Sequence, residues 1–205
     1  MSRSLKIAVA DDEPRMRQFY QEILPLLGHE VAVAAKTGAE LIAACKKTPP
    51  DLVITDIKMP DMDGIDATQE ICRTTSVPVI LVSAYDSPEL LERVDGHHVL
   101  AYMVKPIKKQ DLQPAITIAV RRFEEWRALQ KEATDLRQAL QDRKVIERAK
   151  GILMKRAGLD EAGAFQRLQK LARDSNRKLV QVAEMILAVE GAFQPPPEAP
   201  PAETV

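Results

Sequence analysis

Five short apolar runs recur along the first part of the chain at a spacing typical of a parallel sheet. They cover residues 5–10, 31–35, 52–55, 79–83 and 101–104. Each run is almost continuously apolar, which indicates strands that are covered on both faces. Segments with helical periodicity fill the gaps, after Pro14 and at residues 39–46, 65–71 and 88–94. This alternation predicts a doubly wound α/β domain with a five-stranded parallel sheet.

After Asp111 the pattern becomes helical. Residues 115–150 contain neither glycine nor proline. Leucines and an alanine follow a four-three-four spacing at Leu129, Ala133, Leu136 and Leu140. This spacing predicts about two heptads of a coiled-coil seam. Because two heptads are a short seam, an amphipathic helix that packs on its own domain stays open as an alternative. Trp126 lies beside this stripe, and we expect it to be a packing residue.

Two further amphipathic helices are predicted at residues 160–172 and 179–189. The first begins with Asp160 as N-cap, and its apolar face is expected to include Phe165. With the preceding helix they can enclose one small core. The predicted organisation is an α/β domain, a coiled-coil linker helix, a three-helix domain and a disordered proline-rich tail, at residues 1–120, 121–142, 143–193 and 194–205.

Charge divides the chain in the same way. Residues 1–120 carry a net charge of −4, whereas residues 143–193 carry +5, so we expect different partners for the two parts. The two cysteines lack metal-ligand spacing and are expected to stay reduced. No apolar run approaches the ~20 residues of a membrane span, and the N-terminus does not look like a signal peptide. We therefore expect a cytoplasmic protein without membrane association.

Charged and hydroxyl side chains gather where the predicted strands end. Asp11 and Asp12 follow the first strand, Asp56 ends the third, Ser83 ends the fourth and Lys105 follows the fifth. The carboxyl ends of parallel strands form the ligand-binding edge of such sheets. Carboxylates gathered there attract Mg²⁺, and one of them can accept a phosphoryl group. The metal, the lysine ammonium and a hydroxyl can then stabilise the phosphoryl oxygens.

Four segments resemble the receiver domain of two-component response regulators: ADDEP (10–14), DLVITDIKMPDMDG (51–64), PVILVSA (78–84) and AYMVKP (101–106). The resemblance covers the whole first domain and implies a flavodoxin-like fold and a sensor histidine kinase as partner. It also implies that Asp56 is the phosphoacceptor. Asp12 would bind Mg²⁺, with Asp11 helping through water and the backbone carbonyl of Lys58 as a further ligand.

The same resemblance implies a switch. Lys105 would contact the phosphoryl group, and the Lys105–Pro106 bond would be cis. Ser83 would move toward the phosphoryl group, and Tyr102 would turn into the space that it leaves. This would remodel the surface of residues 84–120, which leads into the predicted coiled coil.

Residues 143–193 contain basic side chains on small helices and no recognisable catalytic set, so we do not expect an enzyme. Lys144, Arg148 and Lys155 share one helix face, which would give salt-sensitive binding to nucleic acid. Gly151 in the same helix indicates either a close approach of another molecule or helix packing.

This second part resembles the ANTAR domain of transcription antiterminators, through ERAKGILM (147–154), EAGAFQRLQKLA (161–172) and NRKLVQVAEMI (176–186). The resemblance implies binding of paired RNA stem-loops by a homodimer, to control antitermination. We expect phosphorylation to favour that dimer. Scarce aromatic residues argue against base-stacking platforms, and Phe165 is expected in the core. The candidate RNA contacts are Arg148, Lys150, Lys155, Arg156, Arg177 and Lys178.

Two other outputs stay open: a helix-turn-helix that binds DNA, and an adaptor that binds only protein. The segment 179–189 is too apolar and acidic to favour reading of a major groove. The adjacent His97 and His98 could sense pH or bind a metal, but a loop without chemistry is the preferred interpretation.

Overall fold

The computed structural model describes residues 3–84 and 98–192. The predicted helix at 88–94, His97 and the tail at 194–205 lie outside the described residues. The chain divides into two compact units, Met1–Leu129 and Gln130–Val205. Their boundary falls within the predicted linker helix at 121–142.

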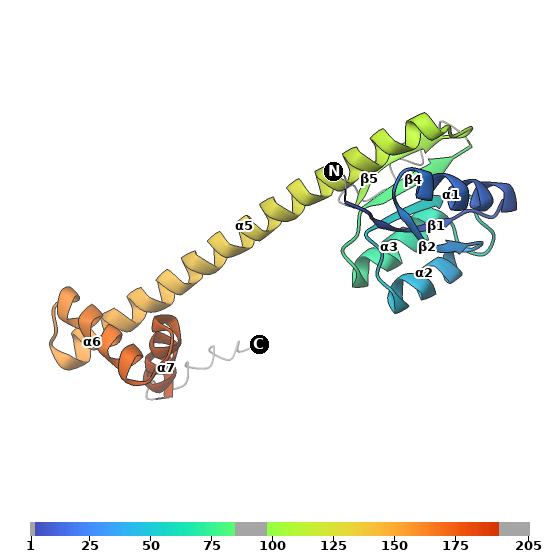
Figure 1. The fold of residues 1–205 in the computed structure, drawn as a ribbon. Helices are drawn as coiled ribbons and strands as arrows, with labels where there is room; N and C mark the ends of the chain where they lie inside the picture. Colours follow the sequence, from blue (N-terminus) through green and yellow to red (C-terminus); the bar gives the residue numbers. More distant parts are fainter. Residues whose placement is uncertain (1–2, 85–97, 193–205) are drawn as a thin grey trace, which may run out of the picture. The chain divides into compact units, whose positions relative to one another are not determined.

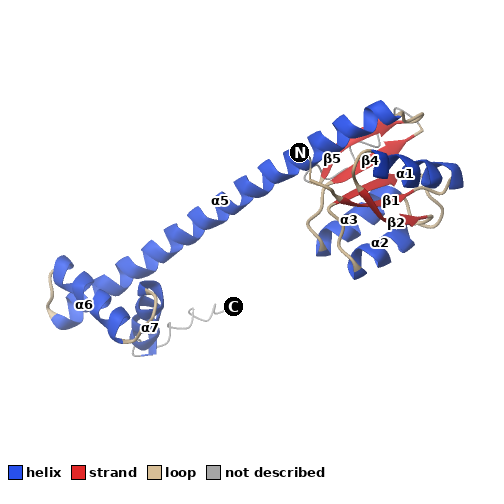
Figure 2. Ribbon diagram, viewed as in Figure 1, coloured by secondary structure: helices blue, strands red, loops and turns tan. Residues whose placement is uncertain are grey.

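The first unit contains the predicted five-stranded parallel sheet (Figure 2). Its strands are β1 (Lys6–Ala10), β2 (Glu30–Ala35), β3 (Leu52–Asp56), β4 (Val79–Ser83) and β5 (Val99–Val104). They lie in the order β2-β1-β3-β4-β5, which is a flavodoxin-like doubly wound arrangement. The predicted fold of this domain is therefore confirmed. All carboxyl ends of the strands meet at one edge, where the candidate site residues lie.

Helices cover both faces of the sheet (Figure 1). They are α1 (Pro14–Leu26), α2 (Gly38–Lys47), α3 (Gly64–Thr74) and the first turns of α5 (Lys109–Ala157). On one face, α2 and α3 bury Leu41 and Ile71 against the strands. On the other face, α1 and α5 bury Leu24 and Leu112. Strands buried on both sides explain why their sequences are apolar without alternation.

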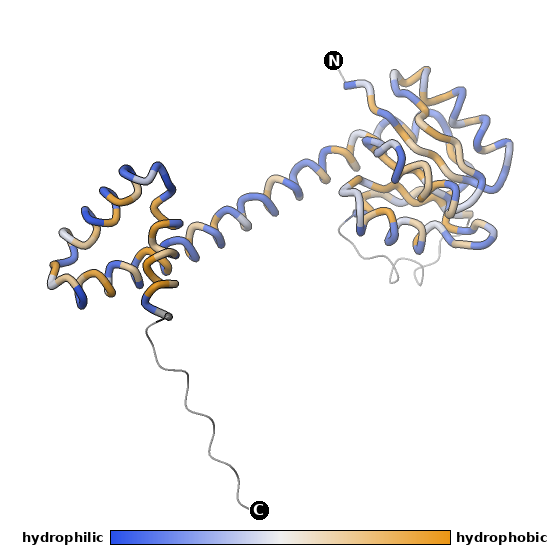
Figure 3. The backbone as a smooth tube through the Cα atoms, turned by 90° about the horizontal axis from the view of Figure 1, so that it is seen from below, coloured by the Kyte–Doolittle hydropathy of each residue, from blue (hydrophilic) through white to orange (hydrophobic). Residues whose placement is uncertain are grey.

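Helix α5 is a single element of 49 residues that runs from the first unit into the second. Leu112 and Ile116 belong to the core of the first unit, and Ala149 belongs to the core of the second. Between them the helix is mostly hydrophilic, whereas the strands are mostly hydrophobic (Figure 3). Despite the length of α5, no described helix is apolar enough to cross a membrane.

The predicted coiled-coil seam on α5 is exposed to solvent. The residue exposures of Leu129, Leu136 and Leu140 are 65%, 60% and 61%. In the described part of the chain, these leucines therefore do not pack on their own domain, which was the open alternative for this stripe.

Trp126 lies beside the seam and packs within the first unit. Its ring centroid lies 5.7 Å from that of Phe123 and 5.3 Å from that of His98. The prediction that Trp126 is a packing residue is therefore confirmed. His98 also belongs to this aromatic cluster, and the only group of potential metal ligands found among the described residues does not include it.

The second unit contains the predicted three-helix core. Helices α6 (Glu161–Asp174) and α7 (Leu179–Ala192) pack with the end of α5 around Ala149, Leu168 and Val182. Asp160 caps α6 as predicted, because its Oδ1 accepts a hydrogen bond of 2.8 Å from the backbone N–H of Gly163.

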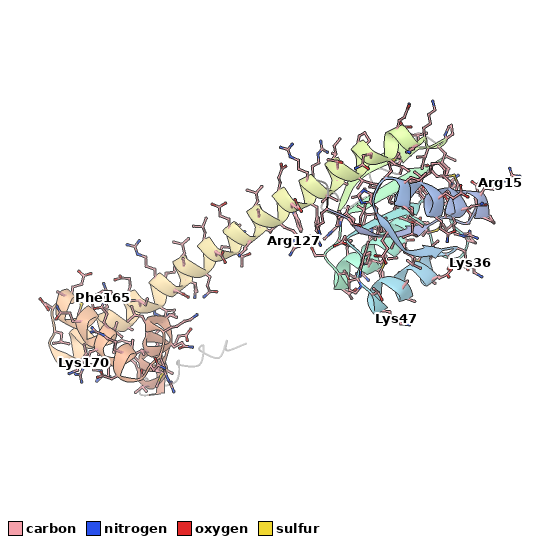
Figure 4. The ribbon with its side chains drawn as sticks, viewed as in Figure 1. Arg15, Lys36, Lys47, Arg127, Phe165 and Lys170 are labelled. Carbon is pink, nitrogen blue, oxygen red and sulfur yellow. The ribbon has the colours of Figure 1, made fainter. Side chains whose placement is uncertain are left out.

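The prediction that Phe165 lies in this core is wrong. Its side chain reaches the surface of α6 (Figure 4), and the residue is 37% exposed. The buried face of α6 is centred on Ala164 and Leu168, so Phe165 falls at its edge. The ammonium of Lys150 lies 5.9 Å from the centre of its ring. A helical stripe read from sequence is wider than the face that the neighbouring helices cover.

Gly151 lies on an exposed part of α5. A Cβ atom placed on it would have no neighbour within 4 Å among the described residues. Gly151 therefore does not serve helix packing within the described chain. The other interpretation, a close approach by another molecule, remains a prediction.

Candidate functional site

Three carboxylates converge at the carboxyl edge of the sheet. Asp11 and Asp12 directly follow β1, and Asp56 is the last residue of β3. One oxygen from each lies within 4.8 Å of the others. Asp11 is fully buried and Asp56 is 5% exposed, whereas Asp12 faces solvent. Burial raises the pKa of Asp11, although the nearby Lys105 opposes that shift.

This donor set fits Mg²⁺. All three side chains offer oxygen ligands, and the exposed Asp12 leaves one side of the group open to water and to a phosphate oxygen. A divalent cation would also relieve the repulsion between the two buried carboxylates.

Lys105 provides the cation that the described structure places beside these acids. Its Nζ lies 2.5 Å from Oδ2 of Asp56, 2.9 Å from Oδ2 of Asp11 and 3.4 Å from Oε1 of Glu13. Burial disfavours the ammonium, but the contacts with Asp56 and Asp11 outweigh burial and raise the pKa of Lys105. The lysine is therefore charged at neutral pH. The Lys105–Pro106 bond is cis, as the resemblance implied.

Backbone groups fix the orientation of the buried carboxylates. The N–H of Lys58 donates a hydrogen bond of 3.2 Å to Oδ1 of Asp56, and the N–H of Glu13 donates one of 3.0 Å to Oδ1 of Asp11. Such bonds leave the second oxygen of each carboxylate for Lys105 or for a metal.

Two residues of this edge escaped the reasoning from sequence. Glu13 contacts Lys105, and Arg17 donates hydrogen bonds of 2.7 and 2.8 Å to the backbone carbonyls of Asp11 and Asp12. Glu13 stands within the ADDEP segment, and Arg17 lies one helical turn further along α1. Both residues follow closely on Asp11 and Asp12 in the sequence, and this proximity could have indicated that they belong to the site.

Gly64 is required because the chain returns close to the site. Its backbone N–H donates a hydrogen bond of 2.8 Å to the carbonyl of Ile57. A Cβ atom at residue 64 would collide with the backbone carbonyl oxygen of Asp56. Only glycine therefore lets α3 begin directly behind Asp56.

The two predicted switch residues lie on neighbouring strands. Asp56 pairs in register with Val82 of β4, so Ser83 stands one residue beyond it. Ser83 is 1% exposed, and its carbonyl accepts a hydrogen bond of 2.8 Å from the N–H of Lys105. Tyr102 is half-buried and packs against the core beneath α2 and α3.

The six candidate RNA contacts fall into two groups. In the first group, acidic side chains of the same unit already neutralise the cation. Lys150 is 7% exposed, with its Nζ 2.8 Å from Glu161 and 2.9 Å from Glu147. These contacts raise the pKa of Lys150. Arg156 donates two hydrogen bonds, of 3.0 and 3.2 Å, to Glu190. Both side chains join helices of this unit. Lys150 is buried and therefore poorly accessible to a phosphate, whereas the Arg156 side chain is 62% exposed and would have to exchange Glu190 for a phosphate.

The second group consists of Arg148, Lys155, Arg177 and Lys178. All four are exposed, and the described part of the chain gives none of them an acidic partner. Arg177 donates a contact of 2.8 Å to the sulfur of Met185. Their charge is therefore available to an anionic partner.

Comparison with known families agrees with both resemblances. The family model of the response regulator receiver domain matches residues 7–117, and that of the ANTAR domain matches residues 134–187. The chain is 39% identical over 186 residues to the transcriptional regulatory protein PdtaR of Mycobacterium tuberculosis, with 91% of each chain covered. It is 34% identical over 119 residues to a probable transcriptional regulator, ycf27, of Pyropia yezoensis, with 57% of this chain and 48% of that protein covered.

Solved structures resemble the first unit. A response regulator receiver domain protein from Clostridium thermocellum matches with a TM-score of 0.52 and 31% identity, over 58% of this chain and 96% of that one. A CheY-like receiver domain protein from Methanospirillum hungatei matches with a TM-score of 0.55 and 27% identity, over 60% of this chain and 98% of that one.

Proposed function

The chain belongs to the family of response regulators that combine a receiver domain with an ANTAR domain, and from this premise we propose that it is a phosphorylation-dependent regulator that binds RNA. Its family consists of regulatory proteins, not enzymes. The observation that carries the proposal is the group of Asp11, Asp12 and Asp56 with Lys105 beside it.

In this proposal Asp56 accepts a phosphoryl group from a phosphohistidine of a sensor kinase. The bond from phosphorus to the histidine nitrogen breaks, and a bond from phosphorus to a carboxylate oxygen of Asp56 forms. Asp12, Asp11, Asp56 and the carbonyl of Lys58 would hold Mg²⁺, which supplies positive charge for the phosphoryl oxygens when bound.

The lysine and the switch residues then respond to the new charge. The acyl phosphate formed on Asp56 carries about two negative charges in place of the single charge of the carboxylate. The ammonium of Lys105, now shared between Asp56 and Asp11, moves to a phosphoryl oxygen. The hydroxyl of Ser83 donates a hydrogen bond to another phosphoryl oxygen, and Tyr102 follows it inward.

The output would be RNA binding by a homodimer. An ANTAR domain implies recognition of RNA stem-loops, and the similar PdtaR is named as a transcriptional regulator. The exposed cations Arg148 and Lys155 would contact phosphates. Two copies would pair through the exposed seam that includes Leu136 and Leu140. Control of antitermination would follow from RNA stem-loops held by the dimer.

Labelling with radioactive acetyl phosphate and Mg²⁺ tests the first step. Asp56→Asn should abolish labelling. Asp61→Asn is the matched control, because Asp61 lies outside the acidic group and has a φ of 71°, which asparagine also adopts. Labelling of Asp56→Asn at the wild-type level would show that another residue is the acceptor.

A second experiment tests the output. Sedimentation of the full chain with and without acetyl phosphate should show more dimer in the phosphorylated sample, and Leu136→Lys should remove that gain. Retention on RNA stem-loops, but not on duplex DNA, should rise in parallel. Retention on DNA alone would favour a DNA-binding regulator, and retention on neither would favour a protein adaptor.

A further inference from the structure

The turn between α6 and α7 forms a hollow lined by basic side chains. The hollow has a volume of about 750 Å³. Its lining includes three cations, Arg173, Arg177 and Lys178, together with the amide side chains of Gln169 and Asn176. Arg177 and Lys178 are among the RNA contacts predicted from the sequence, whereas Arg173, Gln169 and Asn176 are not.

The backbone explains why these side chains meet. Helix α6 ends with Ser175 as C-cap, and Asn176 takes a left-handed conformation with a φ of 51°. The N–H of Asn176 donates to the carbonyl of Arg173, and that of Arg177 donates to the carbonyl of Ala172, at 3.1 and 3.0 Å. These bonds reverse the chain tightly after α6. The last turn of α6 therefore shares one hollow with the residues that lead into α7.

The charge of this hollow is not balanced by acids. No acidic side chain lines it, and within residues 3–84 and 98–192 none of its three cations forms an ion pair. Elsewhere in the same unit, Lys150 and Arg156 are both paired with glutamates. Three neighbouring cations repel one another, so an anion that enters the hollow gains from all three.

We infer that this hollow binds phosphodiester groups of RNA, as an anchor additional to the exposed cations Arg148 and Lys155 of α5. The inference rests on the proposed RNA-binding function. Guanidinium groups match phosphate oxygens with two parallel hydrogen bonds, which a lysine cannot do. The amides of Gln169 and Asn176 can both donate and accept hydrogen bonds, so they suit ribose hydroxyls and base edges.

These amides also distinguish RNA from other anions. Inorganic phosphate could use the cations and accept hydrogen bonds from the amides, but it offers these amides no ribose hydroxyl and no base edge. An acidic peptide offers carboxylates but no hydroxyl at the position of the ribose 2′-OH. RNA provides phosphates and 2′-hydroxyls at regular spacing along one strand.

Titration of a labelled RNA that carries two tandem stem-loops into the full chain, treated with acetyl phosphate and Mg²⁺, over a series of KCl concentrations tests the inference. Arg173→Ala and Arg177→Ala should each lower the affinity on the order of tenfold and reduce the slope of log K against log[salt] by about one. Arg177→Lys keeps the charge and the fold. It should retain the salt slope but lose part of the affinity.

Lys170→Ala is the matched control. Lys170 lies on the same helix (Figure 4) but does not line the hollow, so its removal should change the affinity by less than about twofold. If Arg173→Ala and Arg177→Ala bind RNA as Lys170→Ala does, the inference is wrong while the proposed function stands. If the wild-type chain binds no RNA, the proposed function itself fails.

Competition identifies the source of the anion. Inorganic phosphate and poly-glutamate, each added at the same concentration of anionic groups as the RNA, should leave the RNA bound. Displacement by inorganic phosphate would make the hollow a general anion site, and displacement by poly-glutamate would favour a protein partner. Either result would overturn the assignment to RNA.

Discussion

Lys105→Met should strongly destabilise the receiver unit in the absence of Mg²⁺. The substitution keeps the length and most of the volume of the side chain but removes the ammonium. That ammonium lies 2.5 Å from Asp56 and 2.9 Å from Asp11, and the lysine side chain is only 12% exposed. Its loss leaves two carboxylates buried next to each other without a cation.

The expected magnitude follows from the geometry. Carboxylate oxygens of Asp11 and Asp56 lie within 4.8 Å, so at an effective dielectric constant of about 20 the two charges repel by about 3 kcal/mol. Removing one partner of a buried ion pair typically costs about 3–5 kcal/mol. Both considerations predict that the free energy of unfolding falls by about 3 kcal/mol at pH 7.

The loss should depend on pH. Burial raises the pKa of Asp11 above its ordinary value of 3.8, and removal of Lys105 would raise it further. Between pH 3.8 and the raised pKa of Asp11, the folded variant then holds a proton that the unfolded chain has released. The free energy of unfolding of the variant therefore falls as the pH rises through this range. The folded pKa of Lys105 is raised above 10.5, so its contribution to the wild type is fully present at pH 7. The difference between variant and wild type should therefore be larger at pH 7 than at pH 4.

Urea denaturation followed by fluorescence measures this effect in the correct unit. Trp126 is the only tryptophan of the chain and packs against Phe123 in the first unit. Lys108→Met, at an exposed lysine three residues away, controls for the change in net charge. Mg²⁺ should restore part of the stability of Lys105→Met. Equal stability of the two variants without Mg²⁺ would refute the reasoning.

Three other predictions concern the backbone, a buried histidine and the second core. Gly64→Ala should displace the backbone of Asp56, because the new Cβ collides with it. The free energy of unfolding should therefore fall by about 1–3 kcal/mol, and labelling by acetyl phosphate should become slower. An unchanged labelling rate and an unchanged urea midpoint would contradict this. Burial lowers the pKa of His29, so the unfolded state takes up its proton first as the pH falls. The free energy of unfolding should therefore fall below about pH 6.5, by at most about 1.4 kcal/mol per pH unit. His29→Gln should flatten this slope in urea denaturation at several pH values, and an equal slope would exclude His29 as its source. Leu168 is fully buried in the core of the second unit, so Leu168→Ala should lower the free energy of unfolding of this unit by about 2–5 kcal/mol. Urea denaturation followed by circular dichroism should show this loss, while the urea midpoint of Trp126 fluorescence stays unchanged. A shift of both signals would mean that the units unfold together.

Much of the fold and of the acidic group could be predicted because both follow from local pattern. Continuous apolar runs identified buried parallel strands, and the residues directly after them had to lie at one edge. The convergence of Asp11, Asp12 and Asp56 follows from that single topological rule.

Contacts between distant segments could not be predicted in this way. Lys150 looked like a free cation because its partner Glu161 belongs to another helix, although Glu147 three residues before it was a visible local partner. The periodicity of α6 included Phe165, but the width of the buried face depends on how the neighbouring helices pack. The basic hollow between α6 and α7, lined by side chains from Gln169 to Leu179, likewise depends on a chain reversal that charge counting cannot detect.

The position of Lys105 in the chain links the acidic group to the output. Its side chain contacts Asp56, its backbone N–H donates to the carbonyl of Ser83, and α5 begins four residues later at Lys109. Between Lys105 and Lys109, Ile107 is buried in the core that also contains the first turns of α5. We propose that a phosphoryl group on Asp56 that draws the ammonium away from Asp11 would also displace this segment, which is anchored both to β4 and to the start of α5. Since α5 continues without a break to Ala157, the helix that would receive this displacement also contributes Ala149 to the core of the RNA-binding unit we propose.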